Sequence, residues 1–328
     1  MDRAIVITSI HGVTDAVEQF LDFGEWEVVL VGDRKTPDID RDAFGNLTYL
    51  SLEDQRSLPG ELHELPYDHY CRKNLGYLYA IQQGAEVIAD TDDDNIPKAD
   101  WDAWLSEATT ERSVSGPTFT NVYDYFTDDF VWPRGLPLDE VTTAAPTPTE
   151  RAAAGFDEVG VVQGLADVEP DVDAIFRLVF DDLVEFDDRP PVVLDRGTYS
   201  PFNSQNTLWP VETLYPYLYL PSTVTFRFTD ILRGYVAQRG LWAAGKRLAF
   251  TGASVVQDRN VHDLMADFES EIPCYLRTRE LVETLESLEL SGSPADDVET
   301  IYRELERIGI VEREELDYLD RWLSAIRA

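Results

Sequence analysis

The first hundred residues alternate short apolar runs with segments of helical periodicity. The apolar runs cover residues 5–7, 28–31, 47–52 and 87–89. Between them, apolar side chains recur at helical spacing over residues 13–21 and 75–82, and Gly24 and Gly84 follow these segments. Buried parallel strands read as continuous apolar runs, and helices connect them. The pattern predicts an α/β fold with a mostly parallel sheet flanked by helices.

The middle of the chain is less regular. Pro97 is suited to the first turn of a helix, and that helix would carry Trp101, Trp104 and Leu105. Residues 127–160 are rich in Pro, Thr and Ala and show little periodicity. They predict a long ordered loop or lid.

The C-terminal third returns to regular patterns. A helix is expected over residues 231–244 and a strand over 248–256, and the chain becomes helical from about Arg277. The sequence Ser-Pro-Ala-Asp at 293–296 predicts a capping box with proline in the first helical turn. These patterns divide the chain into an α/β domain over residues 1–276 and a helical extension over residues 277–328.

Charge changes the picture of the surface. The chain of 328 residues carries 63 acidic and 27 basic side chains, for a net charge of −36, yet it is 44% hydrophobic and long enough to bury a full core. Only four lysines occur, Lys35, Lys73, Lys98 and Lys246. The acids are spread along the chain rather than gathered in blocks, as expected for a halophilic protein whose self-repulsion is screened by concentrated salt.

Salt is therefore expected to stabilise the fold. Raising KCl from low salt to molar concentration shortens the Debye length to roughly 3 Å and weakens repulsion between the acids. Melting curves followed by circular dichroism should shift to higher temperature. A melting temperature that stays constant or falls with salt would contradict the halophilic interpretation.

Composition also excludes several classes of partner and location. The strong negative charge argues against binding duplex nucleic acid or an anionic membrane surface. Cys71 and Cys274 form neither a disulfide framework nor a metal-type spacing. We expect no signal peptide and no membrane span, and hence a cytoplasmic protein.

Three consecutive aspartates, Asp92, Asp93 and Asp94, follow the apolar run at 87–89. Ligands of open α/β sheets bind beyond the carboxyl ends of the strands. Mg²⁺ and Mn²⁺ take oxygen ligands, often carboxylates together with phosphate oxygens, and alternate residues of an extended segment point the same way. Asp92 and Asp94 are therefore candidate metal ligands. The alternative is a solvated acidic turn. This alternative carries weight because the chain has 63 acidic residues.

Basic and acidic residues near two other strand ends extend this candidate site. Asp33 and Lys35 follow the second apolar run, where Asp33 could accept a hydrogen bond from a nucleoside and Lys35 could offset phosphate charge. Arg72 and Lys73 open the helix before the aspartate strand. Two of four lysines thus lie beside the expected phosphate site. An ordinary turn and a solvated helix start are the structural alternatives.

Two single residues complete the candidate chemistry. His262 follows the strand expected at 248–256 and is a candidate third metal ligand, although a lone histidine is more often a surface or hydrogen-bonded residue. Asp230 begins a helix after Phe-Arg-Phe-Thr. It is either a general base or a helix N-cap.

Taken together, the motifs over roughly residues 3–275 resemble the STELLO family of putative glycosyltransferases. The resemblance rests on eight stretches. They are residues 26–37 (WEVVLVGDRKTP), 71–80 (CRKNLGYLYA), 86–95 (EVIADTDDDN), 132–138 (WPRGLPL), 162–178 (VQGLADVEPDVDAIFRL), 201–208 (PFNSQNTL), 221–238 and 257–262. The final helices lie outside it.

The resemblance implies a GT-A-type, Rossmann-like sheet and a set of site residues. The residues expected to bind the nucleotide-sugar donor are Thr8, Asp33, Lys35, Arg72, Lys73, Asp92, Asp93, Arg134 and Gln163. Asp92, Asp94 and His262 would hold Mn²⁺ or Mg²⁺. Asp230 occupies the place of an acidic base or acceptor-binding residue.

A weaker likeness leads to the reversibly glycosylated polypeptides, which are UDP-arabinopyranose mutases. They too have Cys-Arg before a Gly-aromatic helix, and a triple aspartate after a strand. Their pattern has arginines at both ends of a segment of eight residues. Here Arg134 matches the first, but Val141 stands at the second position. That departure places mutase activity in doubt.

These features predict a metal-dependent glycosyltransferase that moves a sugar from a nucleotide diphosphate donor, a UDP-sugar, to a hydroxyl of a glycan, lipid-linked or protein acceptor. A nucleotide-sugar mutase or self-glycosylating protein is the alternative enzyme. A scaffold that binds sugar nucleotides without turnover is the alternative from another class.

Overall fold

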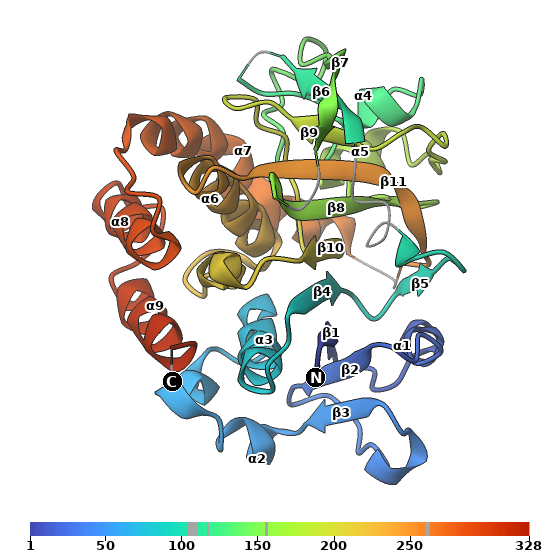
Figure 1. Ribbon diagram of the computed structural model, residues 1–328, viewed down its shortest axis with the longest axis vertical. Coiled ribbons are helices and arrows are strands. Elements are labelled where there is room, and N and C mark those ends of the chain that lie inside the picture. The colour runs from blue at the N-terminus through green and yellow to red at the C-terminus, as the bar shows by residue number, and fades with distance from the viewer. Residues whose placement is uncertain (104–109, 117, 155–156, 260–262, 328) are drawn as a thin grey trace.

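Eleven strands form one mixed sheet in the computed structural model, which describes residues 1–103, 110–116, 118–154, 157–259 and 263–327 (Figure 1). The strands are β1 (Arg3–Ser9), β2 (Glu27–Gly32), β3 (Leu47–Leu50), β4 (Val87–Thr91), β5 (Asn95–Pro97), β6 (Thr110–Ser115), β7 (Thr147–Ala154), β8 (Val159–Asp167), β9 (Val192–Leu194), β10 (Asn206–Trp209) and β11 (Arg247–Gln257). Their order across the sheet is β3-β2-β1-β4-β10-β8-β11-β9-β6-β7, and β5 pairs with β11. The predicted α/β fold, with a large sheet flanked by helices, is confirmed.

Parallel pairing is concentrated in the N-terminal part of the sheet. The four neighbouring strands β3, β2, β1 and β4 are parallel, and they correspond to the four apolar runs of the sequence. Beyond them, β10 runs antiparallel to both β4 and β8, whereas β8 and β11 are parallel. The "mostly parallel" prediction therefore describes the first four strands, and the rest of the sheet is mixed.

The helices cover both faces of this sheet. They are α1 (Asp15–Phe20), α2 (Leu52–Gln55), α3 (Lys73–Gln82), α4 (Tyr123–Phe126), α5 (Ala174–Val179), α6 (Thr229–Ala243), α7 (Leu264–Ser287), α8 (Pro294–Arg307) and α9 (Glu314–Ala325). Figure 1 shows α3, α6, α8 and α9 on one side and α1 on the other. None of these described helices combines the length and apolar character needed to cross a membrane.

Alternation along β1 supplies both cores. Ala4 and Val6 belong to the larger core, which also contains residues of α3, whereas Ile5 and Ile7 belong to the smaller core with Phe20 of α1. Successive side chains of a strand point to opposite faces, so a short apolar run fills both. This burial fixes the register that brings the carboxyl ends of β1, β2 and β4 to one edge.

Gly76 lets α3 approach the sheet closely. A Cβ atom at this position would lie 2.5 Å from Cγ1 of Val6 and 2.6 Å from Cγ2 of Val31. Any larger residue would push the helix away from β1 and β2. The glycine of the Gly-aromatic helix motif thus positions the start of α3 beneath the edge of the sheet.

Two expectations for the middle of the chain are wrong. Pro97 does not open a helix: it ends β5, because residues 95–97 pair with β11. Trp104 and Leu105 lie outside the described residues. The expected loop at 127–160 contains β7, which pairs antiparallel with β6. In both cases a strand forms because it pairs with a segment that is distant in sequence. Local periodicity contains no information about such pairing.

The C-terminal helices pack onto the core of the sheet. Leu281 of α7, Ile301 of α8 and Trp322 of α9 lie in the same buried cluster as Leu75 of α3. The proposed division at residue 276 falls inside α7.

The start of α8 differs from the expected capping box. Ser293 is the N-cap residue with Pro294 behind it, but its side chain makes no capping hydrogen bond. The carboxylate of Asp297, one position beyond the predicted acid, accepts hydrogen bonds from the backbone nitrogens of Ser291 and Gly292 instead. Asp297 therefore closes the turn before the helix.

Glu315 joins α9 to the loop after Tyr219. Its carboxylate is fully buried and accepts hydrogen bonds from the hydroxyl of Tyr219, the backbone nitrogens of Ser222 and Thr223, and the hydroxyl of Thr223. Burial raises the pKa of Glu315, and the four donor groups oppose that rise. The next residue, Val224, accepts a hydrogen bond from Nε2 of His69 at 3.1 Å. A C-terminal residue thus supports a loop that contacts the site described below.

Glu315→Ala is expected to destabilise the protein by about 3 kcal/mol or more, because it leaves several buried donors without an acceptor. Urea unfolding followed by tryptophan fluorescence would measure the loss. Glu314→Ala is the matched control, since Glu314 is the exposed neighbour in the same helix turn. Equal stabilities for the two variants would show that the buried carboxylate does not hold α9 in place.

Candidate functional site

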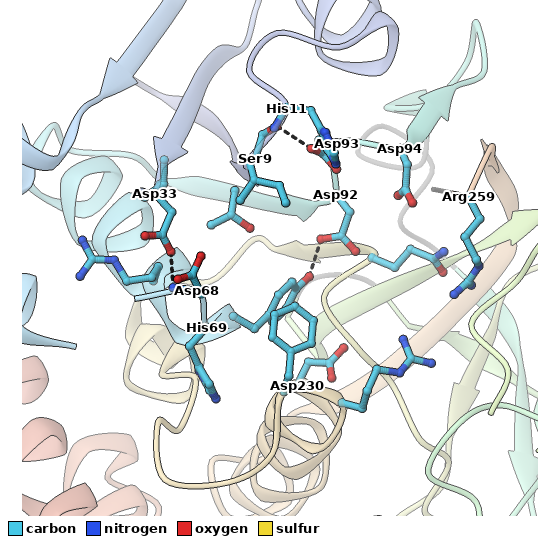
Figure 2. A pocket seen from close by; sticks show the side chains of 18 of the residues that line it. Ser9, His11, Asp33, Asp68, His69, Asp92, Asp93, Asp94, Asp230 and Arg259 are labelled. Atoms are coloured by element: carbon cyan, nitrogen blue, oxygen red, sulfur yellow. Dashed lines mark hydrogen bonds between the residues drawn. The ribbon is translucent and has the colours of Figure 1, made fainter. Parts of the chain in front are cut away.

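A cavity of about 420 Å³ opens at the carboxyl ends of β1, β2 and β4 (Figure 2). Its volume falls in the range of small-molecule sites. Nine residues predicted from the sequence line it: Thr8, Asp33, Lys35, Arg72, Asp92, Asp93, Asp94, Arg134 and Asp230. Figure 2 shows Asp92 between Asp33 on one side and Arg259 on the other. The fold therefore gathers residues as far apart in the sequence as Thr8 and Asp230.

Asp92 is held from below by two side chains. The hydroxyl of Tyr70 donates to its Oδ1, and Nζ of Lys73 lies 3.0 Å from the same oxygen. The side chain is 27% exposed. Burial raises the pKa of Asp92 to about 6, with Lys73 opposing the rise and Asp94 adding to it. Both supporting contacts use Oδ1, which leaves Oδ2 available to the cavity.

Lys73 does not line the cavity. Its ammonium group is fully buried and contacts Oδ1 of Asp90 at 2.7 Å, the carbonyl oxygen of Thr91 at 2.6 Å and Asp92. Asp90 in turn pairs with Nη1 of Arg233 at 2.9 Å. Instead of the expected contact with the donor, Lys73 supports the strand end that carries Asp92.

Asp93 and Asp94 point to different partners. Oδ2 of Asp93 accepts a hydrogen bond from the hydroxyl of Ser9 at 2.5 Å, which ties β4 to the end of β1. Oδ2 of Asp94 accepts from Nε2 of Gln257 at 3.2 Å, while its Oδ1 is buried and has no hydrogen-bond partner. Asp93 is thus engaged within the protein, and Asp94 has one unpartnered oxygen.

Asp92 and Asp94 fit a hard divalent cation. An unpartnered buried carboxylate oxygen is unfavourable unless a ligand or ion contacts it, and Mg²⁺ is commonly held by one or two carboxylates plus phosphate oxygens and water. Within the described part of the chain, no three His, Cys, Asp or Glu side chains form a complete metal-binding group. The predicted third ligand, His262, lies outside the described residues.

The edge of the cavity at β2 is more exposed. Oδ2 of Asp33 accepts from the backbone nitrogen of Asp68 at 2.7 Å, so Asp33 fixes the neighbouring loop. Lys35 is 66% exposed, and its Nζ lies 3.4 Å from Oδ1 of Asp68. Both residues line the cavity, and both also have protein partners.

Arg72 lines the cavity but is largely occupied by the protein. Its Nη1 donates to the carbonyl oxygens of His63 at 2.9 Å and Leu65 at 3.0 Å, and its Nη2 donates to Gln55. The guanidinium also stacks over the ring of Tyr67 at 4.6 Å. Only Nε lacks a partner. Arg72 thus mainly braces the loop below Asp33.

Arg134 bridges two carboxylates on the opposite wall. Nε and Nη2 donate to Asp171 at 2.8 Å each, and Nη1 and Nη2 donate to Asp230 at 3.0 and 2.8 Å. Burial raises the pKa of Asp171, but the charge of Arg134 outweighs burial and the pKa is lowered. Arg134 therefore holds Asp230 in a fixed orientation at the cavity, rather than projecting freely toward a ligand.

Asp230 is not the N-cap of α6. The helix begins at Thr229, its N-cap residue is Phe228, and no side chain makes a capping bond there. Asp230 is 5% exposed and lines the cavity. The structure thus removes the capping alternative considered from the sequence.

Gln163 lies away from the main cavity. Its Nε2 donates to the carbonyl oxygens of Gly164 and Asn206, and its Oε1 accepts from Asn203 and Thr207. It lines a separate cavity of about 10 Å³. Its side chain connects β8 to β10 and to Asn203 just before it, so Gln163 does not line the cavity that holds the other predicted donor-binding residues.

The cavity also contains residues that sequence reasoning did not single out. Ser9, Tyr70, Asp171, Gln257 and Arg259 line it. Asp171, Gln257 and Arg259 fall within stretches on which the family resemblance rests, and Tyr70 immediately precedes one. The family resemblance of those stretches was the only sequence feature that pointed to these residues. The spacing within the stretches does not show which residues line a cavity and which are buried.

Comparison with known proteins identifies two curated relatives, both from Arabidopsis thaliana. The chain is 33% identical to "Probable glycosyltransferase STELLO1" over 270 residues and 32% identical to "Probable glycosyltransferase STELLO2" over 268 residues. Each alignment covers 76% of this chain and 34% of the relative. The chain thus spans about a third of the length of these relatives. No family model matches it.

Solved structures give a weaker likeness. A mycobacterial protein aligns over 85% of this chain and 73% of its own, with 12% identity and a TM-score of 0.42. Glucosyl-3-phosphoglycerate synthase of M. tuberculosis aligns over 84% and 80%, with 11% identity and the same TM-score. Likenesses this distant add nothing to the assignment. The curated relatives, together with the motifs around the cavity, show that this chain belongs to the STELLO-type family of probable glycosyltransferases.

Proposed function

We propose that the chain transfers a sugar from a nucleotide diphosphate donor, a UDP-sugar, to a hydroxyl acceptor. The observation that carries the proposal is the pair Asp92 and Asp94 at the end of β4, each with a carboxylate oxygen that no described residue engages. They face a cavity whose other edge carries Asp33 and Lys35. The curated relatives are named probable glycosyltransferases, which supports sugar transfer.

Different residues of the cavity would bind the different parts of the donor. Asp33 and Lys35, at the exposed edge, would contact the nucleoside and the phosphates. Asp92 and Asp94 would hold Mn²⁺ or Mg²⁺, whose positive charge stabilises the diphosphate as it leaves. Lys73 and Tyr70 keep Asp92 in place. Ser9 holds the carboxylate of the neighbouring Asp93, which also lines the cavity.

Asp230 would accept the proton of the acceptor hydroxyl. A hydroxyl is a poor nucleophile at neutral pH, and a carboxylate within hydrogen-bond reach removes that limitation. The bridge through Arg134 presents Asp230 at the wall of the cavity and restricts its motion. Each carboxylate oxygen can accept more than one hydrogen bond, so the contacts with Arg134 leave room for a substrate hydroxyl.

A donor screen tests this function. The full chain in molar KCl would be melted with a panel of nucleotide sugars, with and without Mn²⁺, because a ligand that binds the native state raises the melting temperature. Donors that stabilise would then be incubated with Mn²⁺ and their products separated. Release of UDP supports a transferase or hydrolase, an isomerised donor supports a mutase, and binding without turnover supports a scaffold. A lack of response to every donor would contradict the proposal.

A further inference from the structure

Arginine side chains with unused hydrogen-bonding capacity lie on the wall beyond Asp94. Arg227 and Arg259 line the cavity, whereas Arg177 of α5 does not reach its surface. In Figure 2, Arg259 lies on the opposite side of Asp92 from Asp33. The chain has 27 basic residues against 63 acids, so cations gathered at one wall of a cavity call for a physical reason.

Arg259 is only partly satisfied by the protein. Its Nη2 donates to Oε1 of Gln257 at 2.9 Å and makes long contacts of 3.4 Å with the carbonyl oxygens of Glu169 and Pro170. Its Nε is buried and has no partner. Arg227 is paired with Glu271: its Nε donates to Oε1 at 2.9 Å, and its Nη2 lies 2.8 Å from the same oxygen but makes no hydrogen bond. Both arginines that line this wall therefore have a buried nitrogen without a hydrogen bond.

Arg177 is more isolated. Its side chain is 9% exposed, and both terminal nitrogens are buried without a hydrogen bond. The nearest carboxylate oxygen, Oδ2 of Asp267, lies 4.0 Å from Nη1. Burial, together with the positive charges of Arg259 and Arg227, lowers the pKa of Arg177 to about 9. The three guanidinium groups are therefore close enough to repel one another.

Such an arrangement is costly for the fold by itself. A buried cation without a paired anion is strongly unfavourable, and hydrogen-bond donors left unmade add to the cost. Repulsion among three cations is relieved when an anion binds between them and the solvent. A phosphate group suits this wall better than a carboxylate, because it carries a charge of about −1.5 to −2 at neutral pH on three acceptor oxygens, whereas a carboxylate has one charge on two.

The position of the wall decides which phosphate it would bind. A donor with its nucleoside near Asp33 and its diphosphate at Asp92 and Asp94 leaves Arg259 on the far side, where sugar and acceptor meet. We propose that the acceptor carries a phosphate group, which Arg259 and Arg227 contact and which the charge of Arg177 stabilises from behind. This inference rests on the proposed transferase function, because it takes the donor's position from it.

Two kinds of molecule would present such a phosphate: a water-soluble phosphomonoester and a lipid phosphate. The residues that follow Arg177 are apolar and exposed. Leu178, Val179 and Phe180 are 45%, 66% and 42% exposed, and the ring of Phe180 lies 5.7 Å from that of Phe130. An isoprenoid chain could cover this surface, so both kinds are compared in the experiment below.

The first measurement is titration of the full chain with inorganic phosphate in molar KCl, without metal or nucleotide. We expect the melting temperature of the unmodified chain to rise with phosphate. Arg259→Gln should weaken phosphate binding by about tenfold or more, the effect of losing a charge-assisted hydrogen bond. Arg279→Gln is the control, because Arg279 is exposed and paired with Asp139.

Arg177→Met separates a binding role from a structural one. Removing a buried cation that has no hydrogen bond at either terminal nitrogen and only a long ion pair with Asp267 should raise the melting temperature without phosphate and reduce the response to phosphate. A variant that is less stable than the unmodified chain and keeps the full phosphate response would show that Arg177 serves packing alone. That result, or an unmodified chain that does not respond to phosphate, would overturn the proposal.

Competition distinguishes the acceptor's phosphate from the donor's. Phosphate should still bind when UDP and Mn²⁺ are saturating, and Asp94→Asn should lose UDP binding while keeping phosphate binding. If UDP with Mn²⁺ displaces phosphate completely, the arginines hold the donor and the acceptor assignment fails. If phosphate binds but no nucleotide does, the proposed donor function fails and the anion site stands.

Acceptor assays complete the test. Glycerol 3-phosphate and farnesyl phosphate in detergent micelles would be offered with the donor identified by the screen, and glycerol and farnesol would serve as phosphate-free controls. A product from only one phosphate identifies the source, soluble or lipid. Equal transfer to the phosphate-free controls, or transfer to none of the four, would overturn the inference.

Discussion

Asp94→Asn is expected to abolish the Mn²⁺-dependent part of UDP binding, with a loss on the order of 10²-fold in affinity, as expected when a metal ligand is removed. Oδ1 of Asp94 is buried without a hydrogen-bond partner, so a bound cation would stabilise it. Asparagine keeps the size of the side chain and an oxygen for Gln257 but removes the negative charge.

The fold should survive this change. Asp92, Asp93 and Asp94 repel one another in the absence of a cation, and removing one charge relieves that repulsion. The melting temperature without metal should therefore stay the same or rise. Isothermal titration of UDP with and without Mn²⁺ would measure the binding. Asp100→Asn, an exposed acid further along the same segment, is the control for charge alone. Unchanged metal-dependent affinity in Asp94→Asn would remove Asp94 from the metal site.

Asp230→Asn is expected to lower transfer by on the order of 10²-fold or more, while UDP affinity stays within a few-fold. The base acts on the acceptor, so its loss affects turnover rather than donor binding. Asparagine can still accept a hydrogen bond from Arg134, which also remains paired with Asp171. The geometry of the wall should therefore persist, and the change isolates the proton-accepting role.

The readouts for Asp230→Asn are melting temperature, UDP affinity and turnover on one sample. Asp230 lies in the first turn of α6, where any acid interacts favourably with the helix dipole. Asp296→Asn in the first turn of α8 is the matched control for that effect. Turnover equal to the unmodified chain would end the assignment of Asp230 as the base. A fall in stability without a fall in turnover per folded molecule would give it a structural role.

Sequence patterns were sufficient for the half of the fold built from local signals. The apolar runs at 5–7, 28–31 and 87–89 became β1, β2 and β4, because a continuous β-branched run can be buried on both faces of a sheet. Once these strands are parallel neighbours, their carboxyl ends meet, and Asp33 and Asp92 are brought to one edge. The candidate site followed from strand ends and from family motifs, without knowledge of any long-range contact.

Contacts between distant segments could not be predicted from the sequence. Lys73 and Gln163 have residue types suited to a ligand, yet the fold turns Lys73 beneath Asp92 and Gln163 into the space between β8 and β10. Likewise β7 forms only because β6 lies beside it. Residue propensity and spacing depend on neighbours along the chain. They could not predict these contacts, because most hydrogen-bond partners of Lys73 and Gln163 are far away in sequence.

The sequence alone therefore determined the α/β class, the succession of the first four strands along the chain, and the position of the aspartate triplet at a strand end. Each of these depends on residues within about ten positions of one another. Tertiary structure alone decided which oxygen of Asp94 is free, that Arg134 bridges Asp171 and Asp230, and that Arg177 and Arg259 keep unpaired donors. Pairing and burial are properties of three-dimensional packing: a polar group is available to a ligand only where no distant part of the chain has already satisfied it.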